Sequence, residues 1–203
     1  MRLPLDGCVT VAWGGAPARG NHHVHSPAER WAVDLLVTID GRSHAGAGDA
    51  LTDYYAYDRP VRAPADGRIV AVHDGVPDAA VARPEPSRRG GNQIVVEVVP
   101  GEHLFLLHLR RGSIGVRAGD RVQRGHIVAR VGNSGNSTEP HLHVHLQDSP
   151  VAGRGQAIPF HFADYVHHTS GQAVVRGMPV GGMRRGQWVG DIVCSREAPQ
   201  PMC

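Results

Sequence analysis

The sequence contains no lysine, so all 21 of its basic residues are arginines. This absence excludes any mechanism or covalent modification that needs a lysine amine. The arginines are spread along the chain rather than clustered, and the formal net charge is only +2. A charge this small and this dispersed does not predict nucleic-acid binding.

Cysteine is scarce, and long apolar runs are missing. Cys8, Cys194 and Cys203 lie near the two ends without Cys-x-x-Cys spacing, so we expect no thiolate zinc site. A disulfide between two of them is compatible with the sequence, which does not specify the pair. No apolar stretch is long enough to span a bilayer, and residues 1–5 lack the apolar core of a secretory signal. We therefore expect no membrane span, and export by that route would need a leader that is missing from this sequence.

Aromatic residues make up only 5% of the 203 residues, whereas glycine (26) and proline (15) are abundant. Short apolar runs alternate with turn residues, which predicts an all-β fold with an antiparallel sheet and long surface loops. We expect strands at residues 9–13, 31–39, 68–73, 93–99, 103–109, 127–131 and 141–146, with a hairpin turn at Pro100-Gly101. Residues 1–150 are expected to form the main domain. Residues 151–203 should be an extension that packs on it, through residues 159–162 and 188–190.

The segment His141-Leu-His-Val-His145 places a histidine at every second position. In a strand such residues share one face, so His141, His143 and His145 should lie together, with Leu142 and Val144 on the opposite face. Three imidazoles on one face favour a metal site or catalysis over a merely exposed, histidine-rich surface.

Two further polar positions interrupt apolar runs. Asp34 lies in a predicted strand, where a lone buried carboxylate is unfavourable unless it is paired or bound to a metal. His108 lies in the apolar segment 103–109, where a lone histidine is more often a core residue than a catalyst. One carboxylate and two imidazoles would give Zn²⁺ three ligands and leave a fourth position open for water.

With these residues in view, the chain resembles the M23 (lysostaphin/LytM-type) peptidoglycan endopeptidases over about residues 10 to 150. The most specific match is Gly132-Asn-Ser-Gly-Asn-Ser-Thr-Glu-Pro-His-Leu-His143, and Val116-Arg-Ala-Gly-Asp-Arg-Val-Gln-Arg-Gly125 matches a second motif. The stretches 60–70 and 91–95 and the pair His108-Leu match further markers. The resemblance implies a LytM-type antiparallel sheet, zinc as cofactor, Asp34 and His143 as metal ligands, and His108 and His141 as catalytic histidines. It leaves open which of those two is the general base.

The first metal ligand departs from the common family pattern His-x-x-x-Asp, because the residue four positions before Asp34 is Arg30. A divergent branch instead has Asn-x-His, a longer insert and then Arg-aromatic-Ala-x-Asp, which this sequence resembles. The resemblance then implies His23 as the first ligand, with His25 as the alternate and His22 third. His145 would be either an edge residue beyond the site or a residue that orients its neighbours, and the edge position is slightly favoured.

The resemblance also implies the activity: zinc-dependent hydrolysis of a peptide substrate, most plausibly a peptidoglycan stem or cross-bridge, by a monomer acting outside the cell or in the periplasm. One alternative is a non-catalytic M23-like module that binds or activates other cell-wall hydrolases. Another is a peptidase with a non-wall substrate. A biotinyl or lipoyl carrier, which shares the Gly-Asp-x-Val-x-x-Gly segment, is excluded because such carriers attach their cofactor to a lysine.

Overall fold

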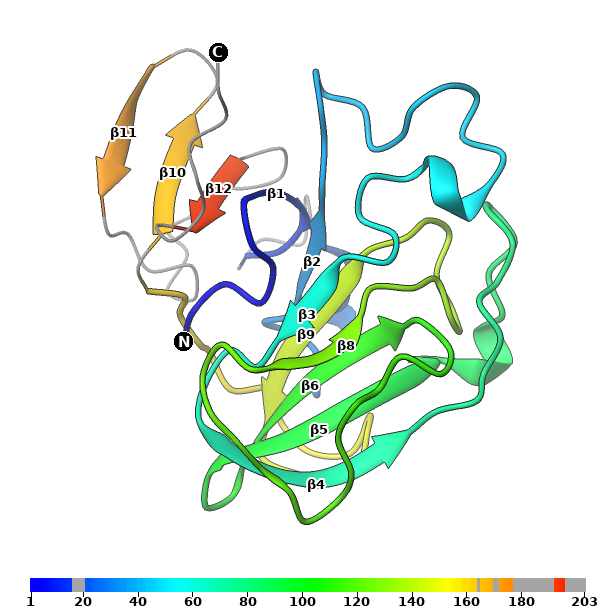
Figure 1. Ribbon diagram of the computed structural model, residues 1–203. Helices are drawn as coiled ribbons and strands as arrows, with labels where there is room; N and C mark the ends of the chain where they lie inside the picture. The colour runs from blue at the N-terminus through cyan, green and yellow to red at the C-terminus, as the bar shows by residue number, and fades with distance from the viewer. Residues whose placement is uncertain (16–20, 164, 170–171, 177–191, 196–203) are drawn as a thin grey trace.

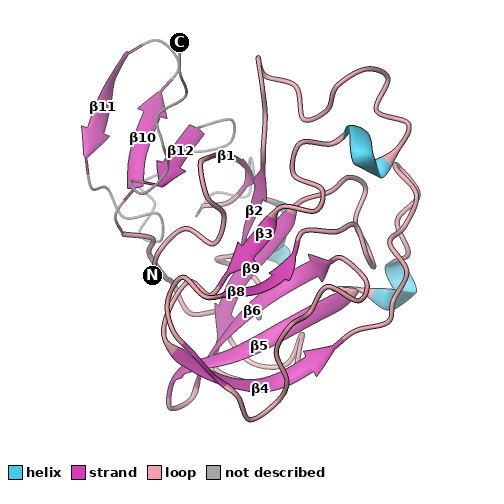
Figure 2. Cartoon of the chain, viewed as in Figure 1, coloured by secondary structure: helices cyan, strands magenta, loops and turns pink. Residues whose placement is uncertain are grey.

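The computed structural model describes residues 1–15, 21–163, 165–169, 172–176 and 192–195. In these residues nearly all regular structure is strand, and helix occurs only as three short 3-10 turns (Figure 2). The turns are η1 (His22–His25), η2 (Leu51–Asp53) and η3 (Pro86–Arg88). The strands are β1 (Cys8–Trp13), β2 (Val33–Leu36), β3 (Pro60–Arg62), β4 (Gly67–His73), β5 (Asn92–Val99), β6 (Glu102–Leu109), β7 (Arg121–Val122), β8 (Ile127–Arg130), β9 (Leu142–Gln147), β10 (Tyr165–Thr169), β11 (Gln172–Arg176) and β12 (Ile192–Ser195). The predicted all-β class is confirmed.

Ten strands form one antiparallel sheet in the order β11-β10-β12-β1-β2-β9-β6-β5-β4-β7. The remaining two, β3 and β8, form a separate antiparallel pair that lies in front of β9 and β6 in Figure 1. The centre of the large sheet is therefore β2, β9 and β6, and β9 pairs with both of its neighbours. This central strand carries the His-rich segment.

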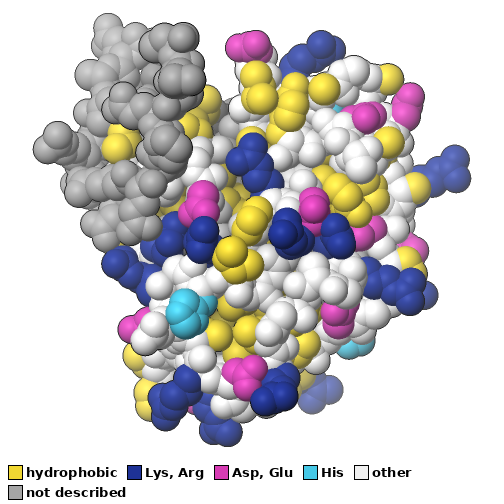
Figure 3. Space-filling view, viewed as in Figure 1, with side chains coloured by type: hydrophobic (Ala, Val, Ile, Leu, Met, Phe, Trp, Pro, Cys, Tyr) yellow, Lys and Arg dark blue, Asp and Glu magenta, His cyan; other side chains and the backbone are white. Residues whose placement is uncertain are grey.

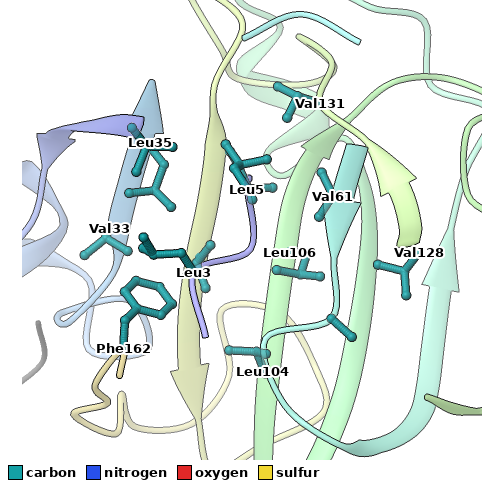
Figure 4. Packing of buried hydrophobic residues seen from close by; sticks show 14 of the residues in the cluster. Leu3, Leu5, Val33, Leu35, Val61, Leu104, Leu106, Val128, Val131 and Phe162 are labelled. Carbon is teal, nitrogen blue, oxygen red and sulfur yellow. The ribbon is translucent and has the colours of Figure 1, made fainter. Parts of the chain in front are cut away.

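The core fills the space between the large sheet and the β3–β8 pair (Figure 4). Leu104 and Leu106 of β6 face Val61 of β3 there, and Leu3 and Leu5 of the N-terminal segment lie among them. The opposite face of β6 is also covered, because Phe105 and Leu107 pack with Val95 in a second cluster. Strand β6 is thus buried on both faces, as its apolar run favours. The end of β5 is not, because Val99 lies beside the Pro100-Gly101 turn and is 48% exposed.

The observed strand boundaries differ from the expected ones mainly where turn residues take the place of part of an expected strand. The segment expected at residues 31–39 is a strand only at Val33–Leu36, since residues 27–31 form turns. Strand β9 begins one residue later than expected, at Leu142. Strands β3 and β7 were not expected, because three and two residues are too short to show an apolar period.

The described part of the C-terminal extension adds strands to the same sheet. Strand β12 pairs with β1, and β10 pairs with β12. A disulfide joins Cys8 to Cys194 across the β1–β12 pair. Phe160 and Phe162 are buried in the main core, as the sequence led us to expect. Residues 188–190 and Cys203 lie outside the described residues, and the domain division at residue 150 stays a prediction.

Arginine and carboxylate side chains are interspersed on the face of the molecule in Figure 3. Within the part of the chain that the structure describes, no helix is long and apolar enough to cross a membrane.

The assigned core can be tested at Leu106, which is fully buried in the centre of the sheet. Leu106→Ala should lower the free energy of unfolding by about 2–5 kcal/mol, because apolar burial is lost and a cavity remains. Urea unfolding measures this change. The matched control is Val99→Ala in the exposed end of β5, which should change stability by less than about 0.5 kcal/mol. Equal effects of the two substitutions would contradict the assigned core.

Candidate metal centre

The site is built around the carboxylate of Asp34, which lies on β2 and is only 4% exposed. One oxygen, Oδ2, lies 3.0 Å from His23 Nε2, and the other, Oδ1, lies 2.9 Å from His143 Nδ1. His141 Nε2 lies 3.7 Å from Oδ1. The structure therefore brings together Asp34, His23, His141 and His143, four of the five residues that the sequence singled out.

The pairing of β2 with β9 explains how residues 109 positions apart meet. Asp34 is directly opposite His143 in the ladder. In an antiparallel pair, residues directly opposite each other project to the same face, so the two side chains meet without help from a loop. Burial alone raises the pKa of Asp34, but the charge of His141 and hydrogen bonds from His143 and His23 outweigh it and hold this pKa well below its ordinary value. The carboxylate is thus ionised and shared among imidazoles.

The first histidine is supplied by η1. Asn21 caps this turn, since its side-chain oxygen accepts from the His23 N–H at 3.0 Å while its amide donates to the carbonyl of Gly15 at 2.7 Å. His23 is buried as a result, whereas His22 and His25 are exposed. His22 also brings a nitrogen within 4.8 Å of the His23 and Asp34 ligand atoms, but the hydrogen bond to Asp34 comes from His23. This contact supports His23 as the first ligand, which stays a prediction.

Strand β9 separates its histidines from its apolar residues. Leu142, Val144 and Leu146 lie in the main core, while His143 and His145 face the other side. The slight preference for His145 as an edge residue is wrong. Its side chain is fully buried, its ring stacks on Phe105 with centroids 4.5 Å apart, and its Nδ1 lies 2.9 Å from His143 Nε2. Burial, then the charge of His143, lowers the pKa of His145 well below its ordinary value, so this imidazole is neutral.

His108 is the last but one residue of β6 and has a left-handed backbone with φ of 61°, which is uncommon for a residue with a side chain. Its Nδ1 donates to the carbonyl of Ser134 at 2.8 Å, and its ring centroid lies 4.8 Å from that of His141. Burial, then the charges of His141 and His143, lowers the pKa of His108 to about 3. His108 therefore joins the site as a neutral imidazole, not as an isolated core residue.

His141 is fixed in the same way as His108. Its Nδ1 lies 2.8 Å from the carbonyl of Glu139 and 3.1 Å from Ser137 Oγ. Because a carbonyl can only accept, Nδ1 carries a proton, and Nε2 is the nitrogen that faces Asp34. The sequence analysis did not identify the carbonyls of Ser134 and Glu139 as acceptors for the two histidines. They could have been suspected from the polar loop 132–136 and from the turn that immediately precedes the His-rich strand.

The four histidines line a groove of about 660 Å³ together with Asp34. Its walls include Trp13, Glu29, Arg89 and Glu139. The loop 76–91 contributes Arg89, and the loop 40–53 contacts the lining residue Glu139, whose Oε2 accepts from Ser43 Oγ at 2.7 Å. The arrangement is an open cleft with a buried carboxylate, two candidate metal-ligating imidazoles and two further imidazoles whose Nδ1 atoms are engaged with loop carbonyls.

Comparison with known proteins identifies the family. Residues 50–159 match peptidase family M23. The chain belongs to this family. The matched residues include His108, His141 and His143 but begin after His23 and Asp34, which is where the spacing departs from the common pattern.

Among curated relatives, the glycyl-glycine endopeptidase ALE-1 of Staphylococcus capitis is 34% identical over 126 residues. These residues make up 61% of this chain and 30% of the relative, so this M23 chain spans less than a third of that relative's length. The catalytic domain of lysostaphin from Staphylococcus simulans matches 74% of this chain and 86% of its own, with 22% identity and a TM-score of 0.45. A zinc-containing peptidase from Vibrio cholerae matches 77% of this chain and 38% of its own, with 23% identity and a TM-score of 0.46.

The buried neutral imidazoles of this M23 chain predict the pH dependence of the metal-free protein. The folded-state pKa of His108 is about 3, against an ordinary value of 6.5, so between these pH values the unfolded chain binds more protons. Stability conferred by the neutral form is fully present above pH 6.5 and is lost as the pH falls, by at most about 1.4 kcal/mol per pH unit for this group. Asp34, whose pKa is also depressed, adds a loss of stability only below about pH 5.

Urea unfolding of chelator-treated protein between pH 7 and pH 4.5 measures this slope. His108→Asn removes the titrating ring and keeps a donor for the Ser134 carbonyl, so its slope should be shallower than that of the wild type. Identical slopes would mean that His108 is not buried in its neutral form.

Proposed function

We propose that this chain is a zinc endopeptidase in which His23 Nε2, Asp34 and His143 Nδ1 hold the metal. One observation carries the proposal: two imidazole nitrogens lie 3.0 and 2.9 Å from the two oxygens of one buried carboxylate. A buried carboxylate surrounded by imidazoles matches the nitrogen and oxygen donors that zinc prefers. When bound by three protein ligands, zinc supplies an open fourth position, at which a water has a pKa of about 7 and a carbonyl is polarised.

His108 and His141 are suited to move the proton. Both rings donate Nδ1–H to a loop carbonyl, so each keeps Nε2 as an acceptor at the groove. One of them takes the proton of the attacking water on Nε2 and passes it to the nitrogen of the leaving amine. We assign the step to this pair without choosing between its members, because the rings lie 4.8 Å apart and both line the groove.

We propose short, extended, glycine-rich peptides of peptidoglycan as the substrate class. The relative ALE-1 is named a glycyl-glycine endopeptidase, and the groove is open, with the long loop 76–91 lining one part of it. The Cys8–Cys194 disulfide fits this proposal, because disulfides persist mainly in oxidising compartments such as the cell surface and the periplasm. A non-catalytic M23-like module is not favoured, since the donor set and both catalytic histidines are present in one groove.

The activity is tested with His143→Ala. Wild-type protein should release new amine termini from purified peptidoglycan or from pentaglycine, and His143→Ala should reduce the release to background because a metal ligand is lost. His126→Ala, an exposed histidine remote from the groove, is the matched control and should retain wild-type activity. Equal release by wild type and His143→Ala would overturn the zinc peptidase. Release from pentaglycine but not from purified peptidoglycan would support cleavage of glycine-rich peptides and overturn the wall polymer as the substrate.

The first ligand is tested by zinc stoichiometry. His23→Ala should lose zinc during gel filtration, whereas His25→Ala and His22→Ala should each retain about one zinc per chain, because their side chains are exposed and His23 contacts Asp34. Metal analysis by mass spectrometry gives the stoichiometry. Retention of zinc in His23→Ala together with its loss in either neighbour would move the ligand to that neighbour.

A further inference from the structure

The face of β9 that carries His143 continues beyond the groove into the protein. His143, His145 and Gln147 occupy every second position of this strand, and all three side chains are buried. His143 Nε2 lies 2.9 Å from His145 Nδ1. The next two polar atoms along the face, His145 Nε2 and Gln147 Oε1, are buried, and neither has a hydrogen-bond partner among the described residues within ordinary limits. The two side chains nevertheless interact with each other.

We call His143, His145 and Gln147 the row. The positions of the protons along it follow from which nitrogen of His143 binds the metal. If His143 uses Nδ1 toward the metal, that nitrogen carries no proton, and a neutral ring then carries its proton on Nε2. The Nε2–H of His143 points at His145 Nδ1, which must accept. A neutral His145 that accepts at Nδ1 carries its own proton on Nε2, and the acceptor that its side chain meets next is Gln147 Oε1.

Gln147 is oriented by the loop that follows β9. Its Nε2 donates to the carbonyl of Ser149 at 2.6 Å, and it lies 2.8 Å from that of Val151 and 3.0 Å from that of Arg154. Three carbonyls around the amide nitrogen fix which end of the amide is the donor. The oxygen is therefore held on the opposite side, where it can act only as an acceptor.

We propose that His145 and Gln147 are positioning residues that fix the proton of His143 on Nε2 and so present its Nδ1 to zinc. The stacking of the His145 ring on Phe105 holds the acceptor in place, and the loop 148–156 anchors the far end of the row. Hydrogen-bond partners of this kind set the tautomer and orientation of a metal-bound histidine. The inference rests on the proposed zinc site, but it concerns residues that touch neither metal nor substrate.

Glu29 is the competing acceptor. Its carboxylate lies within 4.8 Å of ligand atoms of both His143 and His145, and it is less buried than either histidine. The 2.9 Å contact from His143 Nε2 goes to His145, so we assign the orienting role to His145 and none to Glu29. These three residues could instead hold a second cation, and the experiment separates that outcome.

The test measures zinc affinity by chelator competition on the purified 203-residue chain, with the thermal midpoint of the metal-free protein as a check of the fold. His145→Phe keeps a ring against Phe105 and removes the acceptor, so zinc should bind about 10–100-fold more weakly. His145→Asn removes the ring and keeps an acceptor near the position of Nδ1, so it should bind within about threefold of the wild type. Glu29→Gln should also bind zinc as the wild type does.

Gln147→Met tests the same inference independently of whether His145→Phe folds. It should weaken zinc binding, and it should add nothing in a His145→Phe background, because the two residues act through one row. Wild-type affinity in both His145→Phe and Gln147→Met would overturn the inference, and so would equal losses in His145→Phe and His145→Asn. Weaker zinc binding in Glu29→Gln would assign the orienting role to Glu29. A second zinc that binds the wild type and is absent from Glu29→Gln would assign a second metal site. Failure of the wild type to bind zinc would instead overturn the proposed function itself.

Discussion

The geometry of the site depends on one buried carboxylate. Asp34 lies in β2 between Val33 and Leu35, which are both buried, and its side chain is ionised among imidazoles. A charge in such surroundings is strongly unfavourable unless its partners are well placed. The partners depend on the register of β2 with β9, because a slip of one residue would set Leu142 or Val144 opposite Asp34 and turn the histidines into the apolar core. The same alternation that fills the core therefore also assembles the candidate metal centre.

A second constraint holds His108 in its unusual backbone conformation. Its N–H donates to the carbonyl of Gly90, and its own carbonyl accepts from the N–H of Gly132. The loops on which these glycines lie approach each other closely: a Cβ at Gly91 would come within 2.4 Å of the Ser134 backbone. Gly91 also has a φ of 61°, which suits glycine. The close approach of the two loops places the Ser134 carbonyl beside His108, so the backbone strain and the fixed ring have a common origin.

The parts of the site that follow from local pattern were predictable from the sequence. Alternation placed His141, His143 and His145 on one face, and an apolar context marked Asp34 and His108 as unusual. The choice of His23 among three neighbouring histidines was not readable from spacing, because it depends on Asn21 capping a single 3-10 turn. Likewise the strands that follow residue 163 join β1 through long-range pairing, and the sequence period alone gave no indication of that partner. Burial of His145 was missed for the same reason, since Phe105 covers it from another strand.

The location of each histidine in the fold explains which kind of acceptor orients it. His141 precedes β9 and His108 lies at the end of β6, so loop carbonyls of Glu139 and Ser134 are within reach of their Nδ1 atoms. His143 lies inside β9, which pairs with β2 on one side and β6 on the other, so the backbone groups around it are engaged in the ladders. A side chain rather than a backbone carbonyl must then accept from its Nε2, and the position two residues further along the same face, His145, lies 2.9 Å away. A central strand that carries a candidate metal ligand can therefore also carry the residue that orients it, whereas a histidine at a strand end can use the backbone of a loop.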